Sequence, residues 1–173
     1  MKSAEPQHKQ LYSLRPCRAD DAGFVIALTE TVMRAHSERT WGSFDRDFHR
    51  SAFAAAFGKL DHSIVICDGA EAGYLAIDHR ADAEYLQWLL LLPATQNRGV
   101  GSAIVRDLIA AANAAGKRVQ LRILPVNTGA RRLYERLGFA VTGTEATSSI
   151  WNTMPLRRDP ASRRCPRRRS IAT

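Results

Sequence analysis

The stretch Gln96-Asn97-Arg98-Gly99-Val100-Gly101 follows an apolar run that ends at Pro93, and it precedes a segment with a helical pattern. A loop between a strand and a helix places several backbone N–H groups at the helix N-terminus, where a pyrophosphate binds well. The two glycines carry no Cβ, so the chain can pass close to such an anion. Alone, the glycine pair also fits an ordinary helix-capping loop, and the rest of the chain decides between these interpretations.

Length and composition favour one globular domain, because the 173 residues are 45% hydrophobic and can bury a sizeable core. The densest apolar run, residues 86–92, is too short to span a membrane and fits a strand. Residues 1–10 are polar and lack the apolar core of a secretory signal. The cysteines Cys17, Cys67 and Cys165 give neither a disulfide framework nor metal-ligand spacing. We therefore expect a cytoplasmic protein with no membrane association and no metal.

The net charge of +8 is concentrated at the C-terminus. Residues 157–173 hold seven arginines against one aspartate, so this tail carries +6 and residues 1–156 carry only +2. The tail is rich in Arg, Pro and Ser and is expected to be disordered. It is either a solvated extension or a segment that binds RNA or another acidic surface. Apart from the tail, the sequence gives no reason to expect nucleic-acid binding.

Hydrophobic periodicity predicts seven strands and four helices in the order β-α-α-β-β-β-α-β-α-β-β, a mixed α/β domain around one twisted sheet. The expected division is a flexible N-terminus (1–10), one domain (11–156) and the tail (157–173). Strands are expected at 11–15, 64–67, 73–78, 84–92, 119–124, 140–144 and 149–156, and helices at 20–35, 44–57, 100–115 and 130–137.

A second motif lies about thirty residues after the first. It reads Val126-Asn127, followed by Ala130, Leu133-Tyr134-Glu135 and Leu137-Gly138-Phe139. The two motifs together resemble the GNAT superfamily of acyl-CoA-dependent N-acyltransferases, over most of residues 11–156. The resemblance implies a mixed, mostly antiparallel sheet flanked by helices. It also implies acetyl-CoA as the cosubstrate.

The resemblance assigns the loop at residues 96–101 to the pyrophosphate of coenzyme A. Backbone N–H groups from Arg98 to Gly101, and of Ser102, would face the phosphates, with the Arg98 side chain as a further contact. The strand before the loop would pair through its backbone with the pantetheine arm. The implied coenzyme-binding residues are Leu89, Leu90, Leu91, Gln96, Asn97, Arg98, Gly99, Val100, Gly101, Ser102, Asn127 and Tyr134.

Asn127 and Tyr134 match family positions with distinct roles. Asn127 would hydrogen-bond the coenzyme. The alternative is a helix N-cap or its neighbour, a position where Thr128 is equally able to cap. Tyr134 matches the tyrosine near the departing sulfur, where a phenol can protonate the thiolate as a general acid. A tyrosine has an ordinary pKa near 10 and is protonated at neutral pH. The alternative for Tyr134 is an aromatic side chain in the core.

The general base is less clear from the sequence. The family often places Glu or His on the central strand at the positions of Tyr85 and Gln87, and neither residue is a useful base. Both are retained as residues that contact the acceptor. Glu84 is the neighbouring carboxylate and the candidate catalytic base, although strand alternation would point it to the opposite face unless a bulge shifts the register.

A polar stretch at residues 35–42 is a second source of acceptor-binding groups. It is expected to be a loop between the first two helices, in a region that overhangs the acceptor site in the family. His36 and Glu38 would take a proton or bind a cationic amine, and Trp41 would cover it. The alternative is a solvated loop with one packed tryptophan.

The expected function is transfer of an acetyl group from acetyl-CoA to a primary amine by direct attack in a ternary complex. The acceptor is a small molecule or a peptide amine, and a homodimer is compatible with the sequence. Two alternatives stay open. One is a non-catalytic module that binds acyl-CoA, and the other is a transferase that the basic tail directs to RNA or another macromolecule.

Overall fold

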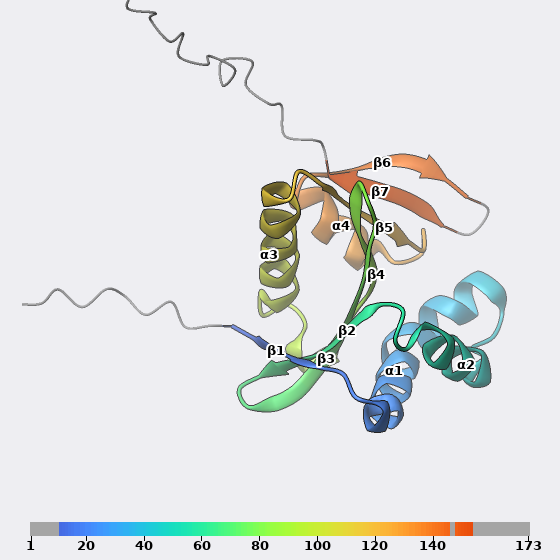
Figure 1. Ribbon diagram of the computed structural model, residues 1–173. Helices are drawn as coiled ribbons and strands as arrows, with labels where there is room; N and C mark the ends of the chain where they lie inside the picture. The colour runs from blue at the N-terminus through green and yellow to red at the C-terminus, as the bar shows by residue number, and fades with distance from the viewer. Residues whose placement is uncertain (1–10, 146–147, 154–173) are drawn as a thin grey trace, which may run out of the picture.

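The computed structural model describes residues 11–145 and 148–153, and these form one sheet with helices on both faces (Figure 1). The expected order of strands and helices and the single α/β domain are confirmed. The elements are β1 (Ser13–Pro16), α1 (Ala22–Trp41), α2 (Arg46–Ala56), β2 (Asp61–Cys67), β3 (Ala70–His79), β4 (Ala83–Leu91), α3 (Val100–Ala114), β5 (Arg118–Ile123), α4 (Thr128–Arg136), β6 (Phe139–Thr144) and β7 (Ser149–Thr153). Short 3₁₀ turns lie at Ala19–Asp21 and Pro93–Thr95.

The sheet is mixed and mostly antiparallel, as expected, with strand order β1-β2-β3-β4-β5-β7-β6. Among the described strands, only the central pair β4–β5 is parallel, and helix α3 makes the crossover between these two strands. The remaining neighbours pair antiparallel. The turn between β2 and β3 holds Asp68 and Gly69, both with positive φ, as the Asp-Gly hairpin signal predicts.

Two apolar cores cover the two faces of the sheet. Helix α3 packs Ile104 and Val105 into the larger core, which also contains Tyr134 of α4. On the opposite face, Val25 and Leu28 of α1 form the smaller core with residues of β2, β3 and β4. Helices α1 and α2 therefore cover one face, while α3 and α4 cover the other (Figure 1).

Strand β4 contains a bulge at Gln87. Trp88 pairs with Ala76 and Leu86 pairs with Ile77, so Gln87 has no partner of its own in β3. An extra residue reverses the alternation of side chains beyond it. Accordingly, Leu86 lies in the core on the α3 face before the bulge, and Leu91 lies in that same core after it. The strand thereby presents apolar side chains to both cores.

Helix α1 is longer than the sequence pattern predicts, and the expected loop at residues 35–42 is wrong. Residues 35–41 form the last two turns of α1, and the helix ends at Gly42, whose φ is 81°. The Gly42 N–H donates to the Glu38 carbonyl and closes the last turn. The segment from Ala35 to Trp41 is polar but contains no Gly or Pro, so nothing in it ends a helix.

Several expectations lie outside the described residues. These are the N-terminus (1–10), the end of the last strand (154–156) and the basic tail (157–173). Among the residues that the structure does describe, none of the helices has both the length and the apolar character of a membrane span.

Gly73 of β3 provides a test of the packing beside β4. A Cβ at Gly73 would lie 2.4 Å from the Leu90 carbonyl oxygen and 2.6 Å from a Leu91 methyl carbon, so strand β4 would have to move. We expect Gly73→Ala to lower the free energy of unfolding by about 1–3 kcal/mol in urea denaturation. Gly23→Ala, where no atom lies within 4 Å of the new Cβ, is the control and should leave stability unchanged or raised. Equal effects of the two changes would contradict the packing described for Gly73.

Candidate functional site

Strands β4 and β5 separate partway along their length. Their parallel pairing covers only Ala83–Leu86 and Arg118–Leu121, although β4 continues to Leu91 and β5 to Ile123. Beyond Leu86, strand β4 keeps its pairing with β3 on one side and has no strand paired on the other side among the described residues. A gap therefore opens in the middle of the sheet.

The open edge of β4 presents unpaired backbone groups. The Leu92 N–H donates to the Ala72 carbonyl at 2.9 Å, which sets the alternation of hydrogen-bonded residues along β4. In this alternation the backbone of Leu90 faces β3, and the backbones of Leu89 and Leu91 face the gap. In agreement, the Gln96 side-chain amide approaches from the other side and donates to the Leu91 carbonyl at 2.8 Å. Leu89 thus offers its backbone N–H and carbonyl to a bound chain, and Leu91 offers its N–H.

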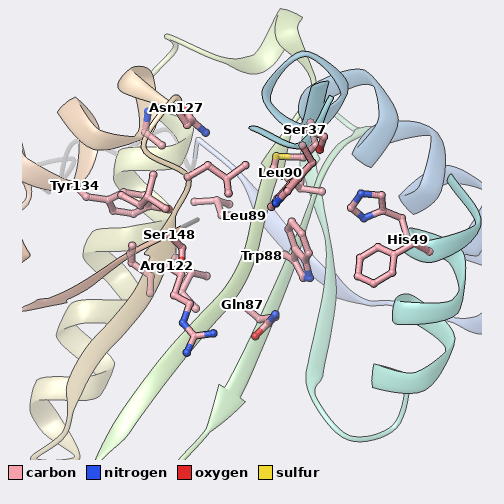
Figure 2. A pocket seen from close by; sticks show the side chains of 18 of the residues that line it. Ser37, His49, Gln87, Trp88, Leu89, Leu90, Arg122, Asn127, Tyr134 and Ser148 are labelled. Carbon is pink, nitrogen blue, oxygen red and sulfur yellow. Dashed lines mark hydrogen bonds between the residues drawn. The ribbon is translucent and has the colours of Figure 1, made fainter. Parts of the chain in front are cut away.

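A cavity of about 600 Å³ occupies the gap and extends to both faces of the sheet. One wall comes from β5, the following loop and α4, and includes Arg122, Asn127 and Tyr134. The other wall comes from the end of α1 and the start of α2, and includes Ser37, Trp41 and His49. Figure 2 shows Tyr134 and Asn127 on one side and Ser37 and His49 on the other, with Leu89 and Leu90 between them.

The loop at residues 96–99 leads into the N-terminus of α3 with two left-handed residues. Asn97 has a φ of 60° and Gly99 a φ of 84°, a conformation that Asn and Gly tolerate best. The first helical hydrogen bond runs from the Ala103 N–H to the Gly99 carbonyl. The N–H groups of Val100, Gly101 and Ser102 precede that bond and, as at every helix N-terminus, lack helical acceptors. This geometry is suited to bind an anion.

The Arg98 side chain, which was expected to contact a phosphate, already pairs with a carboxylate. Its guanidinium donates to the Asp68 carboxylate at 2.9 Å, and both side chains are more than half exposed. Arg98 therefore ties the loop to the β2–β3 turn. A phosphate at the α3 N-terminus would compete with Asp68 for the guanidinium.

Tyr134 is buried in the cavity wall between apolar groups. Its side chain packs edge-on against Phe139, with ring centroids 5.3 Å apart. Burial raises the pKa of Tyr134 well above its ordinary value of 10, so the hydroxyl stays protonated throughout the physiological range. The hydroxyl forms no hydrogen bond with another residue of the described part of the chain, and it can donate to a ligand.

Asn127 caps helix α4 and also lines the cavity. Its side-chain oxygen accepts from the Ala130 N–H at 3.1 Å and caps α4. The residue also lines the cavity. Because the cap uses only the oxygen, the amide NH₂ group is left to donate to a ligand.

Glu84 lies away from the cavity, and the structure does not support its expected role as the base. The bulge at Gln87 comes after Glu84 in the strand, so it does not turn this side chain. One carboxylate oxygen accepts from Lys117 at 2.8 Å and the other contacts His79 at 2.5 Å. Burial alone would raise the pKa of Glu84, but Lys117 and His79 outweigh it and the pKa is lowered. Glu84 is part of a structural ion-pair cluster.

The three residues expected in the loop at 35–42 have different environments. Glu38 is exposed, pairs with Arg34 of the same helix and does not line the cavity. His36 also lies outside the cavity lining, with its Nδ1 buried and unpartnered among the described residues. Only Trp41 reaches the cavity, at its rim.

Tyr85 and Gln87 line the cavity, where the sequence placed acceptor contacts. The Arg80 guanidinium lies over the Tyr85 ring, 3.9 Å from its centroid, and holds the ring in place. Burial raises the pKa of Tyr85. Neither residue is a proton acceptor at neutral pH.

His49 and Ser37 are among the cavity-lining residues that the sequence did not indicate. His49 of α2 stacks on Phe44 at 4.7 Å between ring centroids and meets Trp88 edge-on at 6.3 Å. Ser37 of α1 is buried, and its hydroxyl has no hydrogen-bond partner among the described residues. The signal for Ser37 was its spacing, because Met33, Ser37 and Trp41 recur every four residues and all line the cavity.

No group of three or more His, Cys, Asp or Glu side chains that could hold a metal ion occurs within residues 11–145 and 148–153. The described polar groups of the cavity are side-chain and backbone hydrogen-bonding groups.

Comparisons with known proteins agree with this geometry. Residues 59–141 match the family model of the acetyltransferase (GNAT) domain. A search of the curated proteins found no match.

Solved structures with low sequence identity share the fold. The PaiA N-acetyltransferase of Thermoplasma acidophilum, in complex with coenzyme A, is 14% identical with a TM-score of 0.64, and the match covers 82% of this chain and 98% of that one. The ribosomal-protein-S18-alanine N-acetyltransferase of Escherichia coli is 17% identical with a TM-score of 0.65, covering 86% and 97%. YncA of Salmonella typhimurium, with its cofactor acetyl-CoA, is 19% identical with a TM-score of 0.58, covering 90% and 100%.

The matched domain model spans the strands that form the gap, the α3 N-terminus and α4, and the shared fold extends over most of the chain. Residues 59–141 therefore match the acetyltransferase (GNAT) domain, and the chain has the fold of these acetyltransferases.

Proposed function

We propose that the protein transfers an acetyl group from acetyl-CoA to a primary amine by direct attack in a ternary complex. The observation that carries the proposal is the open edge of β4, which lies between the α3 N-terminus and a cavity lined by Tyr134. Two of the structural neighbours are complexes, one with coenzyme A and one with acetyl-CoA.

Successive parts of acetyl-CoA, from the pyrophosphate through the pantetheine arm to the thioester, each have matching groups in the site. The N–H groups of Val100, Gly101 and Ser102 offer donors to the pyrophosphate, and the α3 dipole adds partial positive charge. The backbones of Leu89 and Leu91 match the amides of the pantetheine arm, which would continue the sheet in place of a paired strand. The acetyl thioester then reaches the cavity near Tyr134.

The reaction forms a C–N bond and breaks a C–S bond. The amine nitrogen attacks the thioester carbonyl carbon, and the resulting oxyanion is stabilised by backbone N–H groups of β4. When the tetrahedral intermediate collapses, the thiolate leaves and Tyr134 protonates it, which yields the amide and the free thiol of coenzyme A. Holding both reactants in one cavity supplies the rest of the rate enhancement.

The attacking amine must lose a proton, and His49 is assigned as the acceptor. Among the side chains that line the cavity, only Asp45 and His49 can accept a proton near neutral pH. The Asp45 carboxylate is engaged by the Phe48 N–H at 2.8 Å as the cap of α2. The ring of His49 forms no hydrogen bond with another described residue, so either nitrogen can face the amine.

The surroundings of His49 keep it neutral. Burial lowers the pKa of His49 below its ordinary value, and the negative charge of Asp45 opposes this only in part. Arg34 of α1 lies over the Phe44 ring that stacks on His49, and Arg34 itself pairs with Glu30. Tyr85, Tyr134 and Arg122 are the titratable and charged groups elsewhere in the described cavity lining, and Tyr74 shares a smaller cavity with His49. A neutral imidazole at pH 7 can act as a base.

Coenzyme binding is tested by a charge at the α3 N-terminus. Ser102→Glu adds a carboxylate where the phosphates are proposed to bind, whereas Ala110→Glu adds the same charge at an exposed position of the same helix. In calorimetry, Ser102→Glu should weaken acetyl-CoA binding by about tenfold or more, about 1.4 kcal/mol, and Ala110→Glu should leave it unchanged. Equal affinities for the two variants would contradict the proposed phosphate site.

The role of Tyr134 is tested by Tyr134→Phe. We expect the rate of thiol release to fall by about 10²–10⁴-fold, with acetyl-CoA affinity close to that of the parent, because the hydroxyl acts only on the leaving group. Tyr12→Phe is the matched control, since Tyr12 bonds to Asp107 outside the cavity. A loss of affinity as large as the loss of turnover would instead assign Tyr134 to packing.

The role of His49 is tested by the pH dependence of turnover. The base must be neutral, so kcat should rise with pH through the lowered pKa of His49, below about 6.5, and then level off. His49→Gln should lower the plateau and remove this acidic limb. His36→Gln is the control, because burial also lowers the pKa of His36, which does not line the cavity. An unchanged pH profile in His49→Gln would exclude His49 as the base.

A further inference from the structure

We propose that the cavity wall made by α1 and α2 is an acceptor subsite for a small primary amine that carries an aromatic ring. This inference rests on the proposed acetyl transfer and names the class of acceptor. It is argued from where the aromatic side chains lie, from one buried polar atom and from the charge of the wall.

Two large aromatic side chains stand exposed at the rim of the cavity. Six large apolar side chains are exposed among the described residues, and only Trp41 and Phe48 of these line the cavity. Trp41 is 54% exposed and Phe48 63% exposed. Exposed apolar surface gathered at the opening of a cavity indicates a site that an apolar ligand covers.

Deeper in the same wall, the aromatic surface continues. His49 meets the Phe48 ring edge-on at 5.4 Å and the Trp88 ring edge-on at 6.3 Å, and all three side chains line the cavity. Figure 2 shows the His49 ring and the Trp88 indole on the same side of β4. A flat ring entering from the rim would therefore meet aromatic faces and edges along its path.

The amine end of the ligand has its own partner. Ser37 is 2% exposed and lines the cavity, and its buried hydroxyl has no hydrogen-bond partner among the described residues. A buried hydroxyl without a partner is costly, so a bound donor or acceptor there is favoured. In Figure 2, Ser37 lies near Leu90, on the same side of the cavity as His49.

The charges of the cavity favour a cation over an anion. Asp45 gives the α1–α2 wall a carboxylate. Arg122, on the opposite wall, donates to Glu145 at 2.7 Å, so its charge is compensated. A protonated amine is therefore attracted before His49 takes its proton. A ligand that also carries an anionic group is disfavoured.

The test compares phenylethylamine with ethanolamine, which has the amine but no ring. The wild-type chain should have a kcat/KM at least about tenfold higher for phenylethylamine than for ethanolamine. Calorimetry with coenzyme A present should detect binding of phenylethylamine but not of ethanolamine. The double variant Trp41→Ala/Phe48→Ala should lose most of this selectivity. Leu14→Ala, at an exposed leucine of β1 outside the cavity, should retain it.

The outcomes separate the inference from the proposed function. Binding of phenylethylamine that is lost in the double variant supports the subsite. If the same chain acetylates no amine, only the transferase proposal fails. Turnover of ethanolamine as efficient as that of phenylethylamine overturns the subsite and retains the transferase. Failure of phenylethylamine to bind, with coenzyme A bound normally, also overturns the subsite.

Discussion

The parallel pairing of β4 with β5 stops at Leu86 and Leu121, and the rest of the site depends on this. A sheet normally satisfies both edges of a central strand, because unpaired N–H and C=O groups are costly where water is excluded. Here β4 keeps five residues beyond the last pair, and the backbones of Leu89 and Leu91 turn to the gap. The bulge at Gln87 follows the last pair directly, where an extra residue adds twist and bends the strand. Beyond Leu86, strand β4 is thus fixed to β3 on one side, and on its other side the Gln96 side chain bonds to the Leu91 carbonyl.

The two faces of the open sheet serve different chemistry. On the α3–α4 face, we propose that the α3 N-terminus binds the phosphates and that Tyr134 donates a proton. On the α1–α2 face, aromatic side chains and His49 form the other wall of the cavity. The opposite pKa shifts of the two groups have one cause: burial disfavours the charged forms, tyrosinate and imidazolium. Burial therefore keeps a proton donor on one wall and a proton acceptor on the other.

Much of this architecture could be predicted from the sequence. Alternation and turn signals gave the order of the elements, and the Gly-rich loop at 96–101 lies at a helix N-terminus as expected. The end of α1 was not predicted, because the polar residues after Ala35 resemble a loop although Gly42 is the first helix-ending residue. His49 was not indicated, because its position relative to Trp88 depends on how α2 packs on the sheet. The expected base Glu84 was misassigned, because its partners Lys117 and His79 come from separate segments.

The most direct test of the account is amide hydrogen exchange, followed by NMR with and without acetyl-CoA. Leu90 bonds to β3 and serves as the internal reference, whereas the amides of Leu89 and Leu91 face the gap. The account predicts that acetyl-CoA slows exchange at Leu89, Leu91 and residues 100–102, with little change at Leu90. Binding without protection at Leu89 and Leu91 would show that the open edge of β4 is not the coenzyme site.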